Sequence, residues 1–127
     1  MESSAPAGPT PASISQKRVL VVEDHKDMRE ALAEVLALEG YHVSAVPDGE
    51  KALREARRLL PDVILLDLMM PVMNGLQFRA EQLRDPLLAA VPVIVMSAFD
   101  IEVTAAARLS KPFQIDDMLE TVHRLAA

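Results

Sequence analysis

Residues 63–75 read VILLDLMMPVMNG, and this stretch decides how the rest of the chain is interpreted. Residues 63–66 are apolar without alternation, which predicts a parallel strand that is buried on both faces. Asp67 follows at once. A carboxylate beside so apolar a run is costly to remove from water unless a partner compensates it. Asp67 is therefore either a strand-end residue that reaches water or a functional group. Pro71 and Asn74-Gly75 then break the strand pattern and lead into a helix.

The length and composition indicate one domain with an aliphatic core. The chain has 127 residues, of which 50% are hydrophobic and 3% aromatic. It contains no cysteine, which excludes disulfides and thiolate metal sites and is compatible with a reducing compartment, so we expect a cytoplasmic protein. The formal net charge of -6 argues against direct nucleic-acid binding, because phosphate neutralisation needs clustered Lys and Arg. No apolar run is long enough for membrane insertion.

The first sixteen residues differ in composition from the rest of the chain. Residues 1–16 are mostly Ser, Ala, Pro, Gly and Thr, and this composition predicts a disordered N-terminal tail or linker. The folded domain is expected over residues 17–127.

Short apolar runs predict four strands, at residues 18–22, 41–46, 63–66 and 91–96, and a fifth strand is expected just before Lys111. Asp48-Gly49 marks the start of one helix, and Gly40 and Pro61 mark the ends of two. Apolar residues at helical spacing predict four helices. Their predicted inner residues are Met28, Ala31, Leu32, Val35 and Leu36; Ala52, Leu53, Ala56, Leu59 and Leu60; Leu76, Ala80 and Leu83; and Ile115, Met118, Leu119, Val122 and Leu125.

Alternation of strands and helices indicates an α/β fold with a parallel sheet and right-handed crossovers. Residues that directly follow parallel strands lie along one edge of the sheet, where open α/β sheets place their sites. This edge would collect Glu23 and Asp24, Asp67, Ser97 and Lys111.

Three carboxylates held together repel one another, and one lysine cannot neutralise them all. A hard divalent cation such as Mg²⁺ could do so, because it prefers carboxylate, carbonyl and phosphate oxygens. A phosphoryl group would then be stabilised by Mg²⁺, the Ser97 hydroxyl and the Lys111 ammonium, with Asp67 as the nucleophile.

Four short motifs occur in the order Val21-Val22-Glu23-Asp24, then LLDLMMPVMNG at residues 65–75, then Met96-Ser97-Ala98 and finally Lys111-Pro112-Phe113. With these motifs the chain resembles a receiver domain of the two-component response regulators, over residues 17–127. The resemblance implies a flavodoxin-like, doubly wound, five-stranded parallel sheet in the order 2-1-3-4-5 with helices on both faces. It also implies that a histidine kinase or phosphotransfer protein donates a phosphoryl group to Asp67.

The resemblance further implies a role for each residue of the cluster. Asp24, Asp67 and the backbone carbonyl of Met69 would bind Mg²⁺ directly, and Glu23 would act through water. Ser97 would supply the switch hydroxyl and Lys111 would pair with the phosphoryl group. The Lys111-Pro112 bond is expected to be cis.

The sequence departs from the family between Ser97 and Lys111. Only thirteen residues separate them, whereas a helix of about 11 residues, a strand of about 5 and two connections need more. The fourth helix is therefore expected to be shortened or missing, with at most two turns around Ile101 to Ala107. Arg108, Leu109 and Ser110 stand where the family usually carries an aromatic switch residue.

Two apolar residues, Met69 and Phe99, follow Asp67 and Ser97 by two positions. Our hypothesis is that they hinder the hydrolytic water and lengthen the lifetime of an aspartyl phosphate. Met69 also occupies the position at which phosphotransferase enzymes with a nucleophilic Asp usually carry a second Asp. We therefore expect no turnover enzyme.

A phosphorylation-independent pseudo-receiver that only binds partners is the alternative function, and a flavin-binding relative is disfavoured by Glu23 and Asp24 in the first loop. The chain either acts alone through docking or is a fragment of a longer regulator. Its kinase, its output partner and its oligomeric state stay open.

Overall fold

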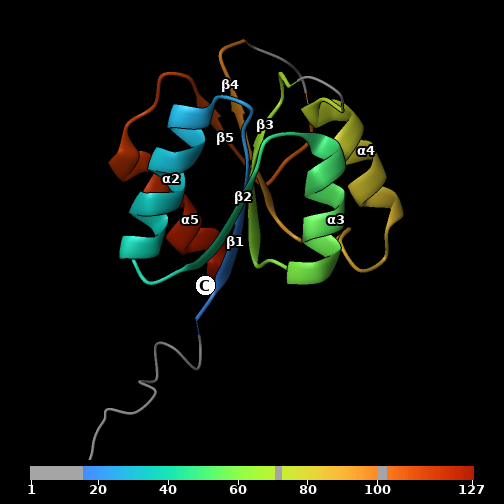
Figure 1. Cartoon of the computed structure of the whole chain (residues 1–127), viewed down its shortest axis with the longest axis horizontal. Coiled ribbons are helices and arrows are strands. Elements are labelled where there is room, and N and C mark those ends of the chain that lie inside the picture. The colour runs from blue at the N-terminus through green and yellow to red at the C-terminus, as the bar shows by residue number, and fades with distance from the viewer. Residues whose placement is uncertain (1–15, 71–72, 100–102) are drawn as a thin grey trace, which may run out of the picture.

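The computed structural model describes residues 16–70, 73–99 and 103–127, and strands alternate with helices through this part of the chain (Figure 1). The predicted tail, residues 1–16, lies outside the described residues except for Gln16, whose side-chain amide donates to the Gly40 carbonyl at 2.9 Å. The elements, labelled as in Figure 1, are β1 (Arg18–Val22), α2 (Lys26–Leu38), β2 (His42–Val46), α3 (Gly49–Leu59), β3 (Val63–Asp67), α4 (Gly75–Arg84), β4 (Val93–Ser97), β5 (Ala107–Ser110) and α5 (Ile115–Ala126).

The five strands form one parallel sheet in the order β2-β1-β3-β4-β5, which confirms the predicted topology. In the register of the sheet Val22 is opposite Leu66, Asp67 is opposite Met96, and Ser97 is opposite Ser110. The ends of β3, β4 and β5 are therefore level with one another, and the residues that follow them begin at the same edge.

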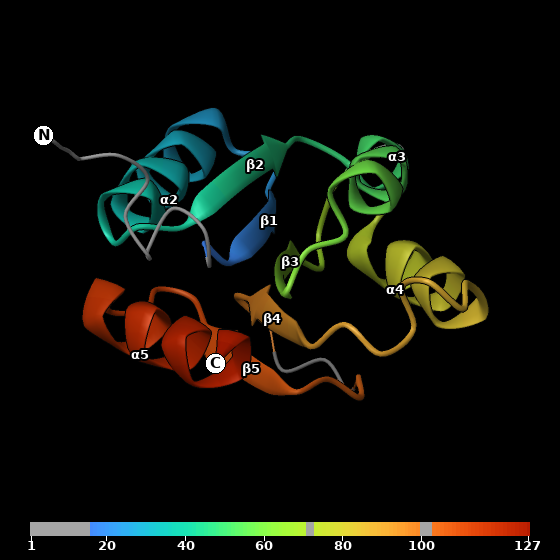
Figure 2. The same cartoon turned by 90° about the horizontal axis from the view of Figure 1, so that it is seen from below.

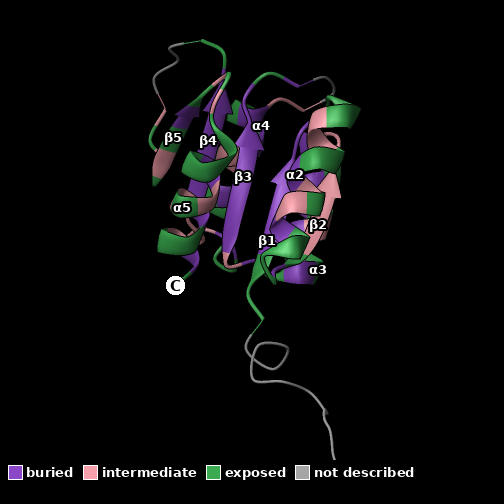
Figure 3. Ribbon diagram, turned by 90° about the vertical axis from the view of Figure 1, so that its left-hand side faces the viewer, coloured by how far each residue is buried: buried purple, intermediate pink, exposed green. Residues whose placement is uncertain are grey.

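Helices cover both faces of the sheet: α2 and α5 lie on one face, α3 and α4 on the other (Figures 1 and 2). Because side chains alternate along a strand, each central strand contributes to both cores. In β3, Val63 and Leu65 face the α2/α5 side, whereas Ile64 and Leu66 face the α3/α4 side. All five residues of β3 are buried, as the continuous apolar run predicted (Figure 3).

The helix starts follow from capping side chains. Asp48 accepts the Lys51 N–H at the start of α3, and Asn74 and Gln77 form a capping box at the start of α4. The prediction that Leu60 lies on the inner side of α3 is wrong. Leu60 follows the end of α3 in a left-handed conformation, with φ of 51°, and is 46% exposed. The last helical residue is Leu59, so Leu60 no longer follows the helical spacing.

The predicted inner side of α4 is also wrong, although the helix itself is present. Leu76 and Leu83 are 43% and 52% exposed and Ala80 is exposed, whereas Phe78 and Gln82 are completely buried. The Gln82 amide donates to the carbonyls of Leu88 and Val91 at 2.8 and 3.1 Å. These bonds allow a polar side chain to be buried where a leucine was expected.

No helix occurs among the described residues between β4 and β5, which agrees with the predicted shortened or missing fourth helix. Residues 103–106 run without regular structure, and Val103 and Ala105 pack on the α3/α4 core. The suggested two turns are not formed at Ala105 to Ala107, because Ala107 is already the first residue of β5, and Ile101 lies outside the described residues. In the described part of the chain, no helix combines the length and apolar character needed to cross a bilayer.

Gly75 is required where α4 starts against the end of β3. A Cβ atom on Gly75 would lie 2.5 Å from the Asp67 carbonyl oxygen and 2.5 Å from Leu68 Cα. These are backbone atoms, which cannot move aside as the end of a flexible side chain can. We expect Gly75→Ala to lower the free energy of unfolding by about 1–3 kcal/mol, measured by urea denaturation.

Leu76→Ala is the matched control, since Leu76 neighbours Gly75 on the exposed side of the same helix. Its expected loss is about 0.5 kcal/mol or less. A loss as large as that of Gly75→Ala would contradict the exposed position of Leu76 and the tight contact at Gly75.

Candidate functional site

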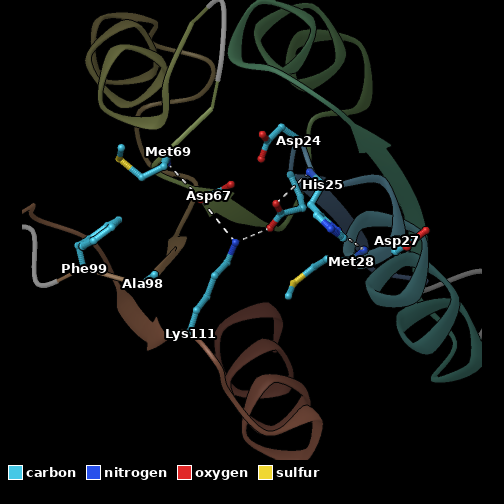
Figure 4. A pocket seen from close by; sticks show the side chains of 10 residues that line it. Asp24, His25, Asp27, Met28, Asp67, Met69, Ala98, Phe99 and Lys111 are labelled. Carbon is cyan, nitrogen blue, oxygen red and sulfur yellow. Dashed lines mark hydrogen bonds and ion pairs between the residues drawn. The ribbon is translucent and has the colours of Figure 1, made fainter.

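A pocket of about 600 Å³ opens at the carboxyl edge of the sheet, where β1, β3 and β4 end (Figure 4). It is open to solvent on one side and contains both acidic and apolar groups. Five of the six predicted site residues line it, and Ser97 is not among the described lining residues. The lining residues are Glu23, Asp24, His25, Asp27, Met28, Asp67, Met69, Ala98, Phe99 and Lys111.

Asp67 is the last residue of β3 and is only 3% exposed. Its Oδ1 accepts the Met69 N–H at 3.1 Å and lies 3.6 Å from Lys111 Nζ. The strand therefore places this carboxylate at the inner end of the pocket, with one hydrogen-bond donor and one cation beside it. The carbonyl of Met69, predicted as a metal ligand, belongs to the same turn.

Glu23 is almost completely buried, with 1% exposure, and is the nearest acidic partner of Lys111. Lys111 Nζ lies 2.8 Å from Glu23 Oε1, and the His25 N–H donates to Glu23 Oε2 at 3.2 Å. Both oxygens of this carboxylate thus have partners, which compensates for its removal from water. The ammonium of Lys111 is shared between Glu23 and Asp67.

Burial raises the pKa of the Asp67 carboxyl from 3.8 to about 7. The charge of Glu23 and a hydrogen bond with Asp24 raise this pKa further, whereas the Met69 N–H and the Lys111 ammonium lower it. The apolar surroundings of the end of β3 therefore outweigh the single cation. Without additional positive charge, the protonated and ionised forms of Asp67 are therefore both populated near pH 7.

Ser97 ends β4 and is 2% exposed. Its hydroxyl donates to the Phe99 carbonyl at 2.8 Å and accepts the Phe99 N–H at 3.0 Å, so it is engaged in a local turn. The Ser97 carbonyl accepts the Lys111 N–H at 2.8 Å. This bond fixes the backbone of Lys111 next to the end of β4. The Lys111-Pro112 peptide bond is cis, as expected.

Met69 and Phe99 stand at the rim of the pocket, 55% and 62% exposed, on the same side of Asp67 and Lys111 (Figure 4). They follow β3 and β4, which are neighbours in the sheet. The opening above Asp67 is therefore bordered by acidic groups on the β1 side and by apolar groups on the β4 side.

Arg29 supports the site, although no sequence pattern pointed to it. Its Nη1 donates to the carbonyls of Glu23 and Asp24 at 3.0 and 3.3 Å, so it holds the acidic loop against the first turns of α2. His25 also acts locally, as the N-cap that accepts the Met28 N–H. Histidine is not among the residue types preferred at an N-cap, and the contacts of Arg29 with two loop carbonyls follow no sequence pattern, which is why neither role was predicted.

The donor set fits a hard divalent cation. Glu23, Asp24 and Asp67 each offer a carboxylate oxygen, and the three oxygens lie within 4.8 Å of one another. Asp24 is exposed and the other two are buried, so the cluster opens toward the pocket. Carboxylate oxygens without thiolate or imidazole ligands suit Mg²⁺, which also keeps water in its coordination sphere.

Comparisons with known proteins agree with this geometry. Residues 19–123 match the family model of the response regulator receiver domain. The chain is 39% identical over 110 residues to the response regulator PleD of Caulobacter vibrioides, covering 80% of this chain and 24% of PleD. It is 33% identical over 115 residues to the DNA-binding response regulator MtrA of Mycobacterium tuberculosis, covering 84% of this chain and 49% of MtrA. The chain thus spans about a quarter to a half of the length of these curated relatives.

Solved structures show the same fold. The chemotaxis response regulator CheY4 of Vibrio cholerae has a TM-score of 0.81 at 28% identity, over 87% of this chain and 99% of that one. The receiver domain of a sensor histidine kinase from Pseudomonas aeruginosa PAO1 has a TM-score of 0.82 at 27% identity, over 88% and 98%. That structure contains a magnesium ion coordinated in the active site cleft.

The raised pKa of Asp67 predicts a pH-dependent stability. The pKa of Asp67 is higher in the folded state than in the unfolded state. The contribution of Asp67 to the free energy of unfolding is therefore complete below about pH 4 and is lost as the pH rises through about 7. In buffer without divalent cations, we expect Asp67→Asn to raise the free energy of unfolding relative to wild type at about pH 8. The gain should shrink toward about pH 5, because wild-type Asp67 is then protonated.

Asp85→Asn is the control with the opposite sign. The side chain of Arg57 and the Leu87 N–H lower the pKa of Asp85, so its replacement should cost stability above its unfolded pKa and cost less in acid. Urea denaturation at several pH values measures both. A stability difference for Asp67→Asn that does not change with pH would contradict the raised pKa.

Proposed function

Because the chain belongs to the response regulator receiver domain family, we propose that it accepts a phosphoryl group on Asp67 from a histidine kinase or phosphotransfer protein and thereby switches the binding of a partner. One observation carries this proposal: the Asp67 carboxylate lies at the inner end of an open pocket, within 3.6 Å of the Lys111 ammonium and beside two further carboxylates. This arrangement combines a nucleophile, a cation and a place for a second cation. The reaction is proposed to take place in the cytoplasm.

Asp67 reacts as the ionised carboxylate. One of its oxygens attacks phosphorus, the bond between phosphorus and the donor histidine nitrogen breaks, and that nitrogen keeps the electron pair. The pKa of about 7 means that a bound cation has to favour the ionised form. Lys111 supplies one positive charge, already shared with Glu23.

Mg²⁺ would supply the remaining positive charge, neutralising the acidic cluster and the phosphoryl oxygens. Asp24, Asp67 and the Met69 carbonyl are proposed as its direct ligands, with Glu23 acting through water. Glu23 suits the indirect role because both its oxygens already have partners, Lys111 and the His25 N–H. Arg29 would keep Glu23 and Asp24 oriented by holding their carbonyls.

Ser97 is proposed as the hydroxyl that changes partner. In the structure it bonds to the Phe99 backbone. On phosphorylation it would leave this turn and donate to a phosphoryl oxygen. The loop after β4 would then lose one of its local bonds, which offers a way for the pocket to change the surface next to it.

The other candidate functions find less support in the pocket. A phosphorylation-independent module would have no need for three carboxylates around an inner lysine, since their mutual repulsion is costly without a cation. A turnover phosphatase with a nucleophilic Asp would usually carry a second Asp two positions after it as general acid and base, and here Met69 stands at that position. We therefore propose a receiver that assists only its own phosphorylation and dephosphorylation.

Intact-mass measurement tests the proposed phosphorylation. After incubation with acetyl phosphate and Mg²⁺, the wild-type chain should gain a single phosphoryl adduct. The adduct should be absent without Mg²⁺ and absent in Asp67→Ala, because the nucleophile is then missing. Asp24→Asn should need a higher Mg²⁺ concentration for the same adduct, by about tenfold if one direct ligand is lost.

Asp27→Asn is the matched control, since Asp27 lines the same pocket without belonging to the three-carboxylate cluster. It should be phosphorylated like wild type. A folded wild-type chain that gains no adduct, or an adduct that persists in Asp67→Ala, would sink the proposal.

The apolar rim predicts a long-lived phosphoryl group. Met69 and Phe99 border the opening above Asp67 on the β4 side, where their apolar side chains would hinder the water that hydrolyses the acyl phosphate. We expect a wild-type half-life of minutes or longer, and Phe99→Ala and Met69→Ala should shorten it several-fold. Loss of the adduct is followed by intact mass after removal of acetyl phosphate.

Leu38→Ala serves as control, because this 80% exposed leucine on α2 lies outside the pocket. The phosphoryl adduct of Leu38→Ala should have the same half-life as that of wild type. A half-life of only seconds in wild type would show that the rim does not hinder the hydrolytic water.

A further inference from the structure

A second feature of the molecule, separate from the pocket, is an apolar stripe along the outer side of α4. It consists of Leu76, Ala80 and Leu83. The two leucines are 43% and 52% exposed, and Ala80 is exposed as well. Large side chains of this kind in a contiguous exposed group indicate an interaction surface more often than isolated ones do.

The spacing shows that the stripe forms one side of the helix. Positions 76, 80 and 83 follow the pattern i, i+4 and i+7, so they lie in line along the helix axis. The side that contacts the sheet consists of Gly75, Phe78 and Gln82. The helix α4 is therefore apolar on two sides, and the described part of the chain covers only one of them.

In the described part of the chain, the segment between β4 and β5 contacts α4 at Arg79. The described residues of this segment form no helix. Arg79 Nε donates to the Thr104 carbonyl at 3.1 Å. The segment is thus held beside Arg79, while the side chains of the stripe stay exposed.

Arg79 gives the surface a charge preference. It neighbours Leu76 at i−3 and Leu83 at i+4 on the helix, and its Nη1 donates to Gln82 Oε1 at 2.6 Å. Partial burial lowers the pKa of Arg79, and none of the described carboxylates lies within 4.0 Å of its guanidinium. A partly desolvated cation whose described partners are only a carbonyl and an amide oxygen favours a carboxylate from outside.

We propose that the α4 stripe binds an amphipathic helix of a partner protein, which packs its own apolar residues on Leu76, Ala80 and Leu83 and places a carboxylate against Arg79. This mode of binding uses apolar anchors at helical spacing for affinity and one charge pair for orientation. It adds a docking site on the face opposite α2 and α5.

A second copy of this chain is the less suitable occupant. Its own α4 would bring another Arg79 rather than an acid to the contact. The only carboxylate of α4, Glu81, already pairs with Arg84 at 2.9 Å, and Asp85 pairs with Arg57 at 2.8 Å. The charge complementarity therefore favours a different, acidic helix.

The test is a selection from a displayed library of helical peptides of about 18 residues, five turns, on wild type with counter-selection on Leu83→Asp. Selected peptides should share apolar residues at i, i+3 or i+4 and i+7 together with one Asp or Glu. In fluorescence anisotropy they should bind Leu83→Asp at least about tenfold more weakly than wild type. Leu38→Asp, the same change at an exposed leucine of α2, should bind like wild type.

A second comparison isolates the charge. For a selected peptide, replacing its acid by the amide should weaken binding to wild type by about tenfold and leave binding to Arg79→Gln unchanged. Thermal unfolding followed by circular dichroism checks that each variant is folded. Failure of this test leaves phosphorylation of Asp67 unaffected, since the two are measured separately.

Three results would overturn the proposal. Selected peptides that bind Leu83→Asp as well as wild type would place the contact elsewhere. Peptides without any preference for acid at one position would remove the role of Arg79. A dimer in analytical ultracentrifugation that Leu83→Asp converts to monomer would show that a second copy covers the stripe.

Discussion

The burial of the Asp67 carboxylate at the end of an apolar strand is the constraint on which the rest of the site depends. The centre of the sheet leaves this group almost no contact with water, and its pKa rises to about 7 as a result. The neighbouring groups change this pKa further. The Met69 N–H and the Lys111 ammonium lower the pKa of Asp67, whereas Glu23 and Asp24 raise it. Added positive charge would stabilise the ionised form of Asp67, which is the electrostatic basis for the proposed Mg²⁺.

The topology explains why these groups meet although 88 positions separate Glu23 from Lys111. All strands are parallel and level at their carboxyl ends, so one residue after each of β1, β3, β4 and β5 reaches the same edge. The two cores on either side hold the strands in register, because a shift of one position would exchange every side chain between them. The position of the pocket therefore depends on the packing of residues far from it.

The sequence predicted the strands and the edge residues because both leave a clear pattern. A run such as residues 63–66 is continuous only when a strand is covered on both faces, and the acidic, hydroxyl and ammonium groups directly follow such runs. The inner side of α4 was not predictable from the same reasoning. Its leucines match helical spacing as well as Phe78 does, and nothing local reveals that Gln82 satisfies two loop carbonyls and takes the buried place. The contacts of Arg29 and the turn at Ser97 were not predicted for a related reason, since in both a side chain bonds to backbone atoms.

Lys111 shows how the resting structure could respond to a phosphoryl group. Its ammonium now lies nearer to Glu23, at 2.8 Å, than to Asp67, at 3.6 Å. A phosphoryl group on Asp67 would add up to about two negative charges and three acceptor oxygens, so the balance of attraction on Lys111 would move toward Asp67. The backbone of Lys111 is bonded to the Ser97 carbonyl, and Ser97 in turn holds Phe99. Charge on Asp67 therefore acts on the residues at the carboxyl ends of both β4 and β5. The connection that leaves β4 contains Thr104, to which Arg79 beside the apolar stripe is bonded. A partner helix on α4 would thus rest near a segment that starts at Ser97, beside the pocket, which gives the proposed docking site a physical route to sense the state of Asp67.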